Sequence, residues 1–170
     1  LAWLWMFDAM FSVINWSLRY LGLVQRGMNW LGDPVLAMLS MIVVNVWRGV
    51  PFFAISLLAG LQTISQQLYE AAAIDGAGAV QRFRYITLPM IKPVLLVVLL
   101  FSIIWTFADF QLAYVLTHGG PANSTHLFAT LAYRVGVVSG QLGEGAAISL
   151  TMFPMLVLVV VGLLLYLRRD

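Results

Sequence analysis

The sequence contains no cysteine and few charged residues. A chain without cysteine forms no disulfide and holds no metal through thiolates. Only 9% of its 170 residues are charged and 62% are hydrophobic, whereas about 25% of the residues in a typical soluble domain are charged. A formal net charge of +2 is too small and too dispersed to favour nucleic-acid binding. The composition therefore favours a protein that lies in a lipid membrane.

Three long apolar segments are present, and each is long enough to cross a hydrocarbon core of about 30 Å as a helix of about 20 residues. They cover residues 35–60, 93–116 and 146–167, and residues 1–7 have the composition of the end of a further span whose beginning is absent. None shows the period-2 alternation of a barrel strand, and a helix satisfies its own backbone hydrogen bonds in lipid. The sequence predicts an all-α integral membrane chain, with one multi-span domain over residues 1–170 that is incomplete at its N-terminal side.

Basic residues are distributed unevenly between the two ends of these spans. One end holds Arg82, Arg84, Lys92, Arg168 and Arg169, and the other holds Arg19, Arg26 and Arg134. Cytoplasmic loops of membrane proteins carry an excess of lysine and arginine. Residues 65–89 and the C-terminal end are therefore expected in the cytoplasm, and residues 8–33 and 117–145 on the opposite side.

The expected cytoplasmic loop, residues 65–89, has the pattern of two short helices joined by a turn. Ser65 is a good N-cap, good helix formers follow it as far as Asp75, and Gly76 is a typical residue for the end of a helix. Small residues at positions 71–73 leave room for another protein. The same pattern is typical of a helical hairpin lying on the membrane surface, so both interpretations stay open on spacing alone.

The order of residues in this loop is more specific than its helical pattern. Glu70-Ala71-Ala72 is followed, after three residues, by Gly76 and, after nine more, by Ile86, any residue, and Leu88-Pro89. This order resembles the EAA loop of ABC importer permeases, which forms the coupling helix that docks on a cytoplasmic ATPase subunit. The resemblance implies that the ATPase-docking residues are Glu70, Ala71, Ala72, Asp75 and Gly76.

Further segments extend the resemblance over nearly the whole chain. They are residues 29–31, 44–47, 58–62, 75–77, 86–89 and 117–121. These segments are similar to the carbohydrate-uptake branch of the importer permeases, which includes the maltose, trehalose and glycerol-phosphate permeases. By this resemblance, the chain contains the end of the third span of that family and all of the last three.

The resemblance also implies partners and a location. It implies a multi-pass chain in the cytoplasmic (inner) membrane of a bacterium or archaeon, with a second permease subunit, an extracytoplasmic solute-binding protein, cytoplasmic ATPase subunits and a sugar-like solute. ATP and Mg²⁺ are expected on the ATPase subunits, so the chain itself is expected to hold no cofactor and no metal and to be no enzyme.

Polar residues repeat at helical spacing inside two of the apolar segments. The two sets are Asn45, Arg48, Gly49 and Phe52 in the first segment, and Ser102, Trp105, Thr106 and Asp109 in the second. The spacing i, i+3, i+4, i+7 places each set on one helix face. Charged side chains at such depth normally face a protein interior or a wet cavity. The sequence therefore predicts one shared polar pathway.

Two interpretations of these polar residues stay open. Arg48 and Asp109 form a structural ion pair between helices, or Asp109 and Asn45 bond to solute hydroxyls while an aromatic ring stacks on a sugar. The resemblance implies a solute site, because positions matching Asn45, Gly49, Phe52, Ser102, Trp105, Thr106 and Asp109 line it in maltose-type permeases. Arg48 is less typical of that family. It favours an anionic solute such as a sugar acid, sulfonate or phosphate, unless Asp109 cancels its charge.

Other polar residues give weaker signals. His118 and His126 flank a Gly-Gly-Pro turn without the convergent carboxylate or cysteine that would complete a metal site. Arg134 and Glu144 are expected to be solvated or to contact the binding protein. The glycines expected to allow close helix packing are Gly136, Gly140, Gly143 and Gly145.

The residues and the resemblance together predict the membrane subunit of an ATP-driven importer for a sugar or sugar-like solute. The alternative is a secondary transporter that uses Asp109 as a proton or ion site. A membrane enzyme would need a convergent acid, base or metal set, and none is visible in the sequence.

Overall fold

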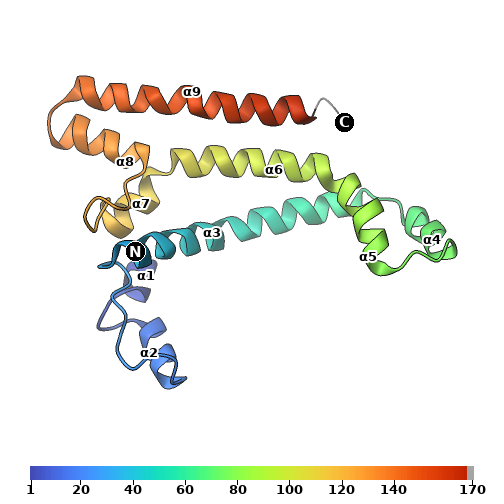
Figure 1. Cartoon of the computed structure of the whole chain (residues 1–170), viewed down its shortest axis with the longest axis horizontal. Coiled ribbons are helices and arrows are strands. Elements are labelled where there is room, and N and C mark those ends of the chain that lie inside the picture. Colours follow the sequence, from blue (N-terminus) through green and yellow to red (C-terminus); the bar gives the residue numbers. More distant parts are fainter. Residues whose placement is uncertain (168–170) are drawn as a thin grey trace. The chain divides into compact units, whose positions relative to one another are not determined.

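A computed structural model describes residues 1–167 of the chain, and over these residues the chain forms helices and no β-strand. The elements are α1 (Ala2–Met6), α2 (Val13–Tyr20), α3 (Pro34–Gln62), α4 (Gln66–Ile74), α5 (Ala79–Arg82), the π-helix η1 (Phe83–Thr87), α6 (Leu88–Ala108), α7 (Phe110–Thr117), α8 (Phe128–Tyr133), the π-helix η2 (Arg134–Val138) and α9 (Leu142–Leu167) (Figure 1). The prediction of an all-α chain is confirmed for this part of the sequence. Arg168 and Arg169, which support the expected orientation, lie outside the described residues.

Within the described residues, three helical runs are long and apolar enough to cross a membrane. The first is α3 and the third is α9, as expected from the apolar segments. The second run covers Ala79–Ala108, because α5, η1 and α6 follow one another without a break. The second short helix of the expected loop is therefore the beginning of this span.

The expectation of one continuous helix over residues 93–116 is wrong. α6 ends at Ala108, and Asp109 takes an extended backbone conformation with φ −76° and ψ 90°. The carboxylate of Asp109 accepts the N–H of Leu112 at 3.1 Å and caps α7. Aspartate favours this position over a helix interior, because its short side chain bonds to nearby backbone N–H groups. Asp109 therefore lies at a helix junction instead of on the polar face of α6.

The chain divides into two compact units. The first unit contains Leu1–Arg48 and Trp105–Val157, and the second contains Gly49–Ile104 and the chain from Leu158 onward. The core of the first unit consists of Phe7, Met41, Val44, Ala113 and Leu116. Figure 1 shows the corresponding elements together, with α7 beside α1 and the first turns of α3. This core fixes the position of α7 against the N-terminal half of α3.

Two glycines in the first unit allow η2 and α9 to approach closely. A Cβ atom on Gly145 would lie 2.5 Å from the Cα atom of Gly136 and 2.8 Å from the carbonyl oxygen of Ala132. The expectation of close packing is therefore confirmed for Gly136 and Gly145. At Gly140 and Gly143 a Cβ would meet nothing within 4 Å, so close packing does not explain those two glycines.

Replacing Gly145 with alanine is expected to destabilise the chain, because the new methyl group collides with backbone atoms that have no rotamer to change. Overpacking of this kind costs about 1–3 kcal/mol. Gly143→Ala is the matched control, since its Cβ enters open space on the same helix. The measurement is the thermal melting of the purified transporter. Equal melting temperatures for the two variants would contradict the close approach.

The second unit is held together by contacts between α3, α6 and α9. A Cβ atom on Gly60 in α3 would lie 3.2 Å from both methyl carbons of Val94 in α6, so the two helices pack closely at that point. Small residues allow such approach between membrane helices. The ammonium group of Lys92 lies 4.6 Å from the ring centroid of Tyr166 in α9, within the range of a cation–π interaction.

Candidate functional site

The loop helix α4 begins and ends where the sequence predicts. The hydroxyl of Ser65 accepts the N–H of Gln67 at 3.3 Å, and Asp75 is the C-cap residue. Gly76 follows with φ +80°, a left-handed conformation that glycine adopts without strain. The N–H of Gly76 donates to Ala73 at 3.1 Å, and the N–H of Ala77 donates to Ala72 at 2.8 Å. These two bonds define a Schellman motif, which terminates the helix.

The residues expected to dock on an ATPase are accessible on this helix. Glu70, Ala71, Asp75 and Gly76 are exposed and Ala72 is half-buried. The neighbouring apolar side chains are also uncovered within the described chain: Ile74 is 87% exposed and Val80 is 79% exposed. An exposed set of apolar, small and acidic residues on a short, firmly terminated helix is suited to contact with another protein.

A hydrogen bond links α4 to the beginning of the second span. The Tyr69 hydroxyl lies 2.9 Å from that of Thr87, the last residue of η1. π-helical turns are rare and occur frequently at functional sites. The sequence gave no sign of this pairing, because it depends on the turn between the two helices. The bond connects α4 to the helical turn directly before α6.

Four of the predicted polar residues meet in the first unit. Asp109 forms an ion pair with the Arg48 guanidinium group, and Arg48 also donates to the Asn45 side-chain oxygen at 3.4 Å. The amide of Asn45 in turn donates to the Thr106 hydroxyl at 3.2 Å. α3 therefore contributes Asn45 and Arg48, and the α6–α7 junction contributes Thr106 and Asp109. We call these four residues the polar cluster.

The two charged groups of the polar cluster differ in exposure. The Asp109 side chain is 9% exposed and that of Arg48 is 49% exposed. Each carboxylate oxygen of Asp109 already accepts a hydrogen bond, one from Arg48 and one from the Leu112 N–H. The half-exposed guanidinium group of Arg48 is the more accessible partner for a solute. The ion pair that the sequence left open is present, and its two charges cancel.

The other predicted solute residues are distributed between the two units. Trp105 belongs to the first unit and is 54% exposed. Gly49, Phe52 and Ser102 belong to the second unit, where the Phe52 ring lies 6.2 Å from that of Phe53 in an edge-on arrangement. A solute contact for these four residues stays a prediction.

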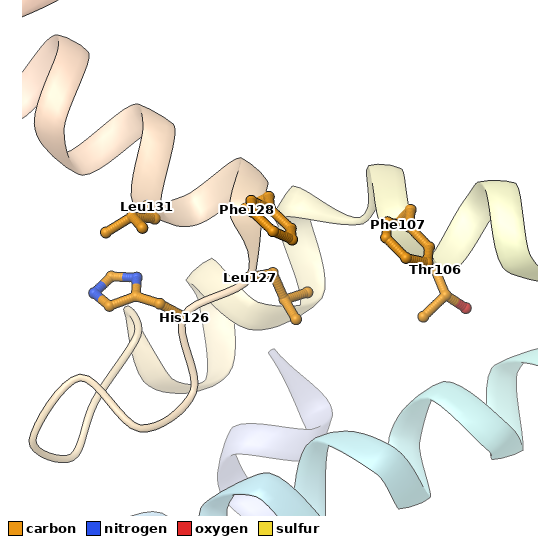
Figure 2. A pocket seen from close by; sticks show the side chains of 6 residues that line it. All are labelled: Thr106, Phe107, His126, Leu127, Phe128 and Leu131. Atoms are coloured by element: carbon orange, nitrogen blue, oxygen red, sulfur yellow. The ribbon is translucent and has the colours of Figure 1, made fainter. Parts of the chain in front are cut away.

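The first unit also contains a cavity of about 460 Å³ beside Thr106. Its lining is mostly apolar and consists of Thr106, Phe107, His126, Leu127, Phe128 and Leu131 (Figure 2). Figure 2 shows that these side chains come from the end of α6, the loop before α8, and α8 itself. The sequence gave no sign of this cavity, because its walls are separated along the chain and come together only in the fold.

The loop before α8 is ordered by polar contacts. Arg134 donates to the Asn123 side-chain oxygen and lies 3.0 Å from Nε2 of His126, while Nδ1 of His126 lies 3.2 Å from the Thr130 hydroxyl. Burial, together with the positive charge of Arg134, lowers the pKa of His126. A neutral imidazole that accepts at Nε2 carries its proton on Nδ1 and donates to Thr130. Arg134 is exposed, as expected, and its hydrogen bonds also stabilise this loop.

The two histidines that flank the Gly-Gly-Pro turn contact other side chains of the first unit. Within residues 1–167, no group of three or more histidine, cysteine, aspartate or glutamate residues lies close enough to hold a metal ion. His118 instead packs edge-on against the ring of Tyr114 with 4.6 Å between ring centroids.

Comparison with known proteins gives consistent matches over the length of the chain. It is 42% identical over 173 residues to the "Trehalose/maltose transport system permease protein MalF" of Thermococcus litoralis, and the match covers 99% of this chain and 57% of that protein. It is 39% identical over 149 residues to the "Sulfoquinovosyl glycerol transport system permease protein SmoG" of Agrobacterium fabrum, covering 88% and 48%. The chain thus spans about half the length of these relatives.

The fold matches a solved structure, and the sequence matches a family. The structure is the "Crystal structure of a bacterial ABC transporter involved in the import of the acidic polysaccharide alginate", with a TM-score of 0.85, 24% identity, and coverage of 99% of this chain and 58% of that one. The family is described as "Binding-protein-dependent transport system inner membrane component" and matches residues 1–169. The chain therefore belongs to this family of inner membrane transport components.

Proposed function

We propose that this chain is a permease subunit of an ATP-driven importer, and that it moves a sugar or sugar-like solute delivered by an extracytoplasmic binding protein. The family description names a binding-protein-dependent transport system. The two relatives described above carry the names of trehalose/maltose and sulfoquinovosyl glycerol permeases. In this proposal a second permease subunit completes the pathway, and two separate ATPase subunits bind ATP and Mg²⁺ and catalyse hydrolysis.

The geometry of α4 is the observation that carries the proposal. Its docking residues are exposed, Gly76 terminates it in a fixed conformation, and Tyr69 connects it to Thr87 at the start of a span. When the ATPase subunits close around ATP, movement of the docked helix is transmitted through this bond to α6. The pathway then opens outward to receive solute, and hydrolysis returns it to the inward-facing state.

The polar cluster suits a neutral, hydroxyl-rich solute better than an anionic one. The ion pair of Arg48 with Asp109 cancels the net charge, while Arg48 retains further N–H donors and half of its surface is exposed. Asn45 and Thr106 add an amide and a hydroxyl. We propose that sugar hydroxyls bond to these groups and that the ring of Trp105 stacks on the sugar face.

The proposed importer uses ATP, whereas a secondary transporter with a proton site at Asp109 would use the proton gradient. Protonation of Asp109 would break its ion pair with Arg48, so a proton-coupled cycle would have to break the polar cluster at each turnover. The test is solute uptake by vesicles that contain the complete transporter and its binding protein. We expect uptake that requires internal ATP and persists when the proton gradient is collapsed. Uptake driven by the gradient without ATP would overturn the proposal.

The proposed docking also requires α4 to face the cytoplasm. Because the chain has no cysteine, single cysteines introduced at Gln66 and Asn123 provide a clean measurement with a membrane-impermeant maleimide. The Gln66→Cys variant is expected to react only from the cytoplasmic side and the Asn123→Cys variant only from the outer side. Reversed labelling would rule out contact between α4 and a cytoplasmic ATPase.

A further inference from the structure

The short helix α2 has a buried polar side and an exposed apolar side. Ser12, its N-cap, is 2% exposed, and Asn15 in its first turn is fully buried. On the opposite side Val13 is 63% exposed, Trp16 62% and Tyr20 79%. A helix on a water-facing surface has the reverse arrangement. The side chains of α2 therefore indicate an apolar environment around its outer side.

Asn15 fixes this orientation of α2. Its side-chain oxygen accepts the N–H of Met28 at 3.0 Å and the indole N–H of Trp30 at 2.9 Å, and its amide donates to the Met28 carbonyl at 2.9 Å. These bonds satisfy the buried polar side and hold α2 against residues just before α3. These bonds keep the apolar side of α2 exposed, because turning that side inward would break all three of them.

The exposed side has the composition of a membrane–water interface. The rings of Trp16 and Tyr20 are stacked with centroids 5.4 Å apart, and Met10 and Phe11, directly before the helix, are 79% and 83% exposed. Tryptophan and tyrosine are enriched at this interface, where an apolar ring with a polar edge suits both phases. Arg19 adds a positive charge on the same helix, and the described chain places no carboxylate within ion-pair distance of it.

A groove lies beside the segment from Met10 to Arg19, which includes most of α2. It has a volume of about 350 Å³ and is lined by Met10, Phe11, Ser12, Val13, Trp16 and Arg19. The apolar members can hold the upper part of an acyl chain, and the guanidinium group can bind the phosphate of the same lipid. Apolar contact combined with one cation is the chemistry that recognises a phospholipid.

α2 lies in the segment that leads into a membrane span. Residues 8–33 connect α1 to α3, and α3 is a membrane span that begins at Pro34. Figure 1 shows α1 and α2 near the N-terminal end of α3. The first turns of α3 expose apolar side chains as well, with Val35 67% exposed. α2 and the beginning of this span therefore both expose apolar side chains.

We infer that α2 lies in the headgroup region of the bilayer at the N-terminal end of α3, with Phe11, Trp16 and Tyr20 among the acyl chains and Arg19 on a phospholipid phosphate. An amphipathic helix of this kind anchors the segment before a span at a fixed depth. This inference rests on the membrane family of the chain and not on the identity of the solute.

The first test uses the complete transporter in vesicles of phosphatidylcholine with brominated acyl chains. A fluorescent label is attached in the Trp16→Cys variant and, as control, in the Gln25→Cys variant, which alters an exposed residue of the same loop. Bromine on the acyl chains is expected to quench the label at position 16 several-fold more than the label at position 25. Quenching of position 16 by aqueous iodide alone, or by neither agent because another protein covers it, would overturn the inference.

A second test addresses the phosphate contact of Arg19. Adding phosphatidylglycerol to the vesicles is expected to raise the melting temperature of the transporter. This increase should be lost in Arg19→Gln and retained in Arg26→Gln, an exposed arginine of the same loop. Equal increases in the two variants would overturn the assignment of Arg19, while failure of ATP-driven uptake would bear only on the proposed function.

Discussion

Replacing Gly76 with leucine is expected to reduce ATP-driven uptake by at least an order of magnitude while the chain still inserts into the membrane. Gly76 has φ +80°, and this left-handed conformation costs a residue with a branched or bulky side chain roughly 1–3 kcal/mol. A leucine would relieve that strain by breaking the bonds from residues 76 and 77 that terminate α4. The docking residues would then no longer share one rigid surface. The measurements are uptake and ATP hydrolysis by the reconstituted transporter.

Two further variants separate backbone strain from side-chain bulk. Gly78→Leu places the same side chain two residues away, where φ is −70° and a Cβ atom meets its nearest neighbour at 3.8 Å, so we expect near-normal uptake. Gly76→Asn should retain part of the activity, because asparagine tolerates the left-handed region better than leucine. Normal assembly and uptake in Gly76→Leu would contradict the role of α4 as a coupling helix.

The geometry of α4 could be predicted because its signals are local. Ser65 at one end and Gly76 at the other are each sufficient to specify a helix end, and both act through bonds to residues two or three positions away. The exposure of Glu70 follows from the same helical spacing. What the sequence did not show was the bond between Tyr69 and Thr87, which depends on how the intervening turn folds.

The polar cluster shows where the same reasoning fails. Helical spacing placed Asp109 on a continuous face with Thr106, but the tendency of aspartate to cap a helix ended α6 one residue earlier. The apolar composition of the segment around it concealed this local preference. Asp109 nevertheless meets Arg48, because the break at the junction leaves it near the end of α6.

Long-range contacts were the least accessible to prediction. The bonds of Asn15 to Met28 and Trp30 connect residues up to 15 positions apart in a region without regular spacing. From the sequence, residues 8–33 were a loop and Asn15 carried no signal. Asn15 is fully buried only because the segment before α3 folds back onto it. The same contacts give α2 its buried polar side and its exposed apolar side.

Replacing Asp109 with asparagine is expected to lower the amount of protein in the membrane, because the change keeps a good N-cap for α7 but removes the charge that neutralises Arg48. Arg48 lies inside the membrane span α3, where a cation without its partner is costly. Asp33→Asn is the matched control. Asp33 accepts the N–H groups of Val35 and Leu36 at 2.9 and 3.0 Å and forms no ion pair in the described chain, so its replacement should leave protein levels unchanged.

Adding Arg48→Met to Asp109→Asn decides whether the polar cluster binds solute. Removing the unpaired cation is expected to restore the amount of protein. It should not restore transport, because the half-exposed guanidinium group that we assign to the solute is then also absent. Loss of a charged hydrogen bond costs about 1.5–3 kcal/mol, which corresponds to a roughly 10- to 150-fold weaker interaction. Solute uptake is measured at equal protein levels in the wild type, the single variant and the double variant. If the double variant transports normally, the ion pair only stabilises the fold, and the solute site must be formed by other residues.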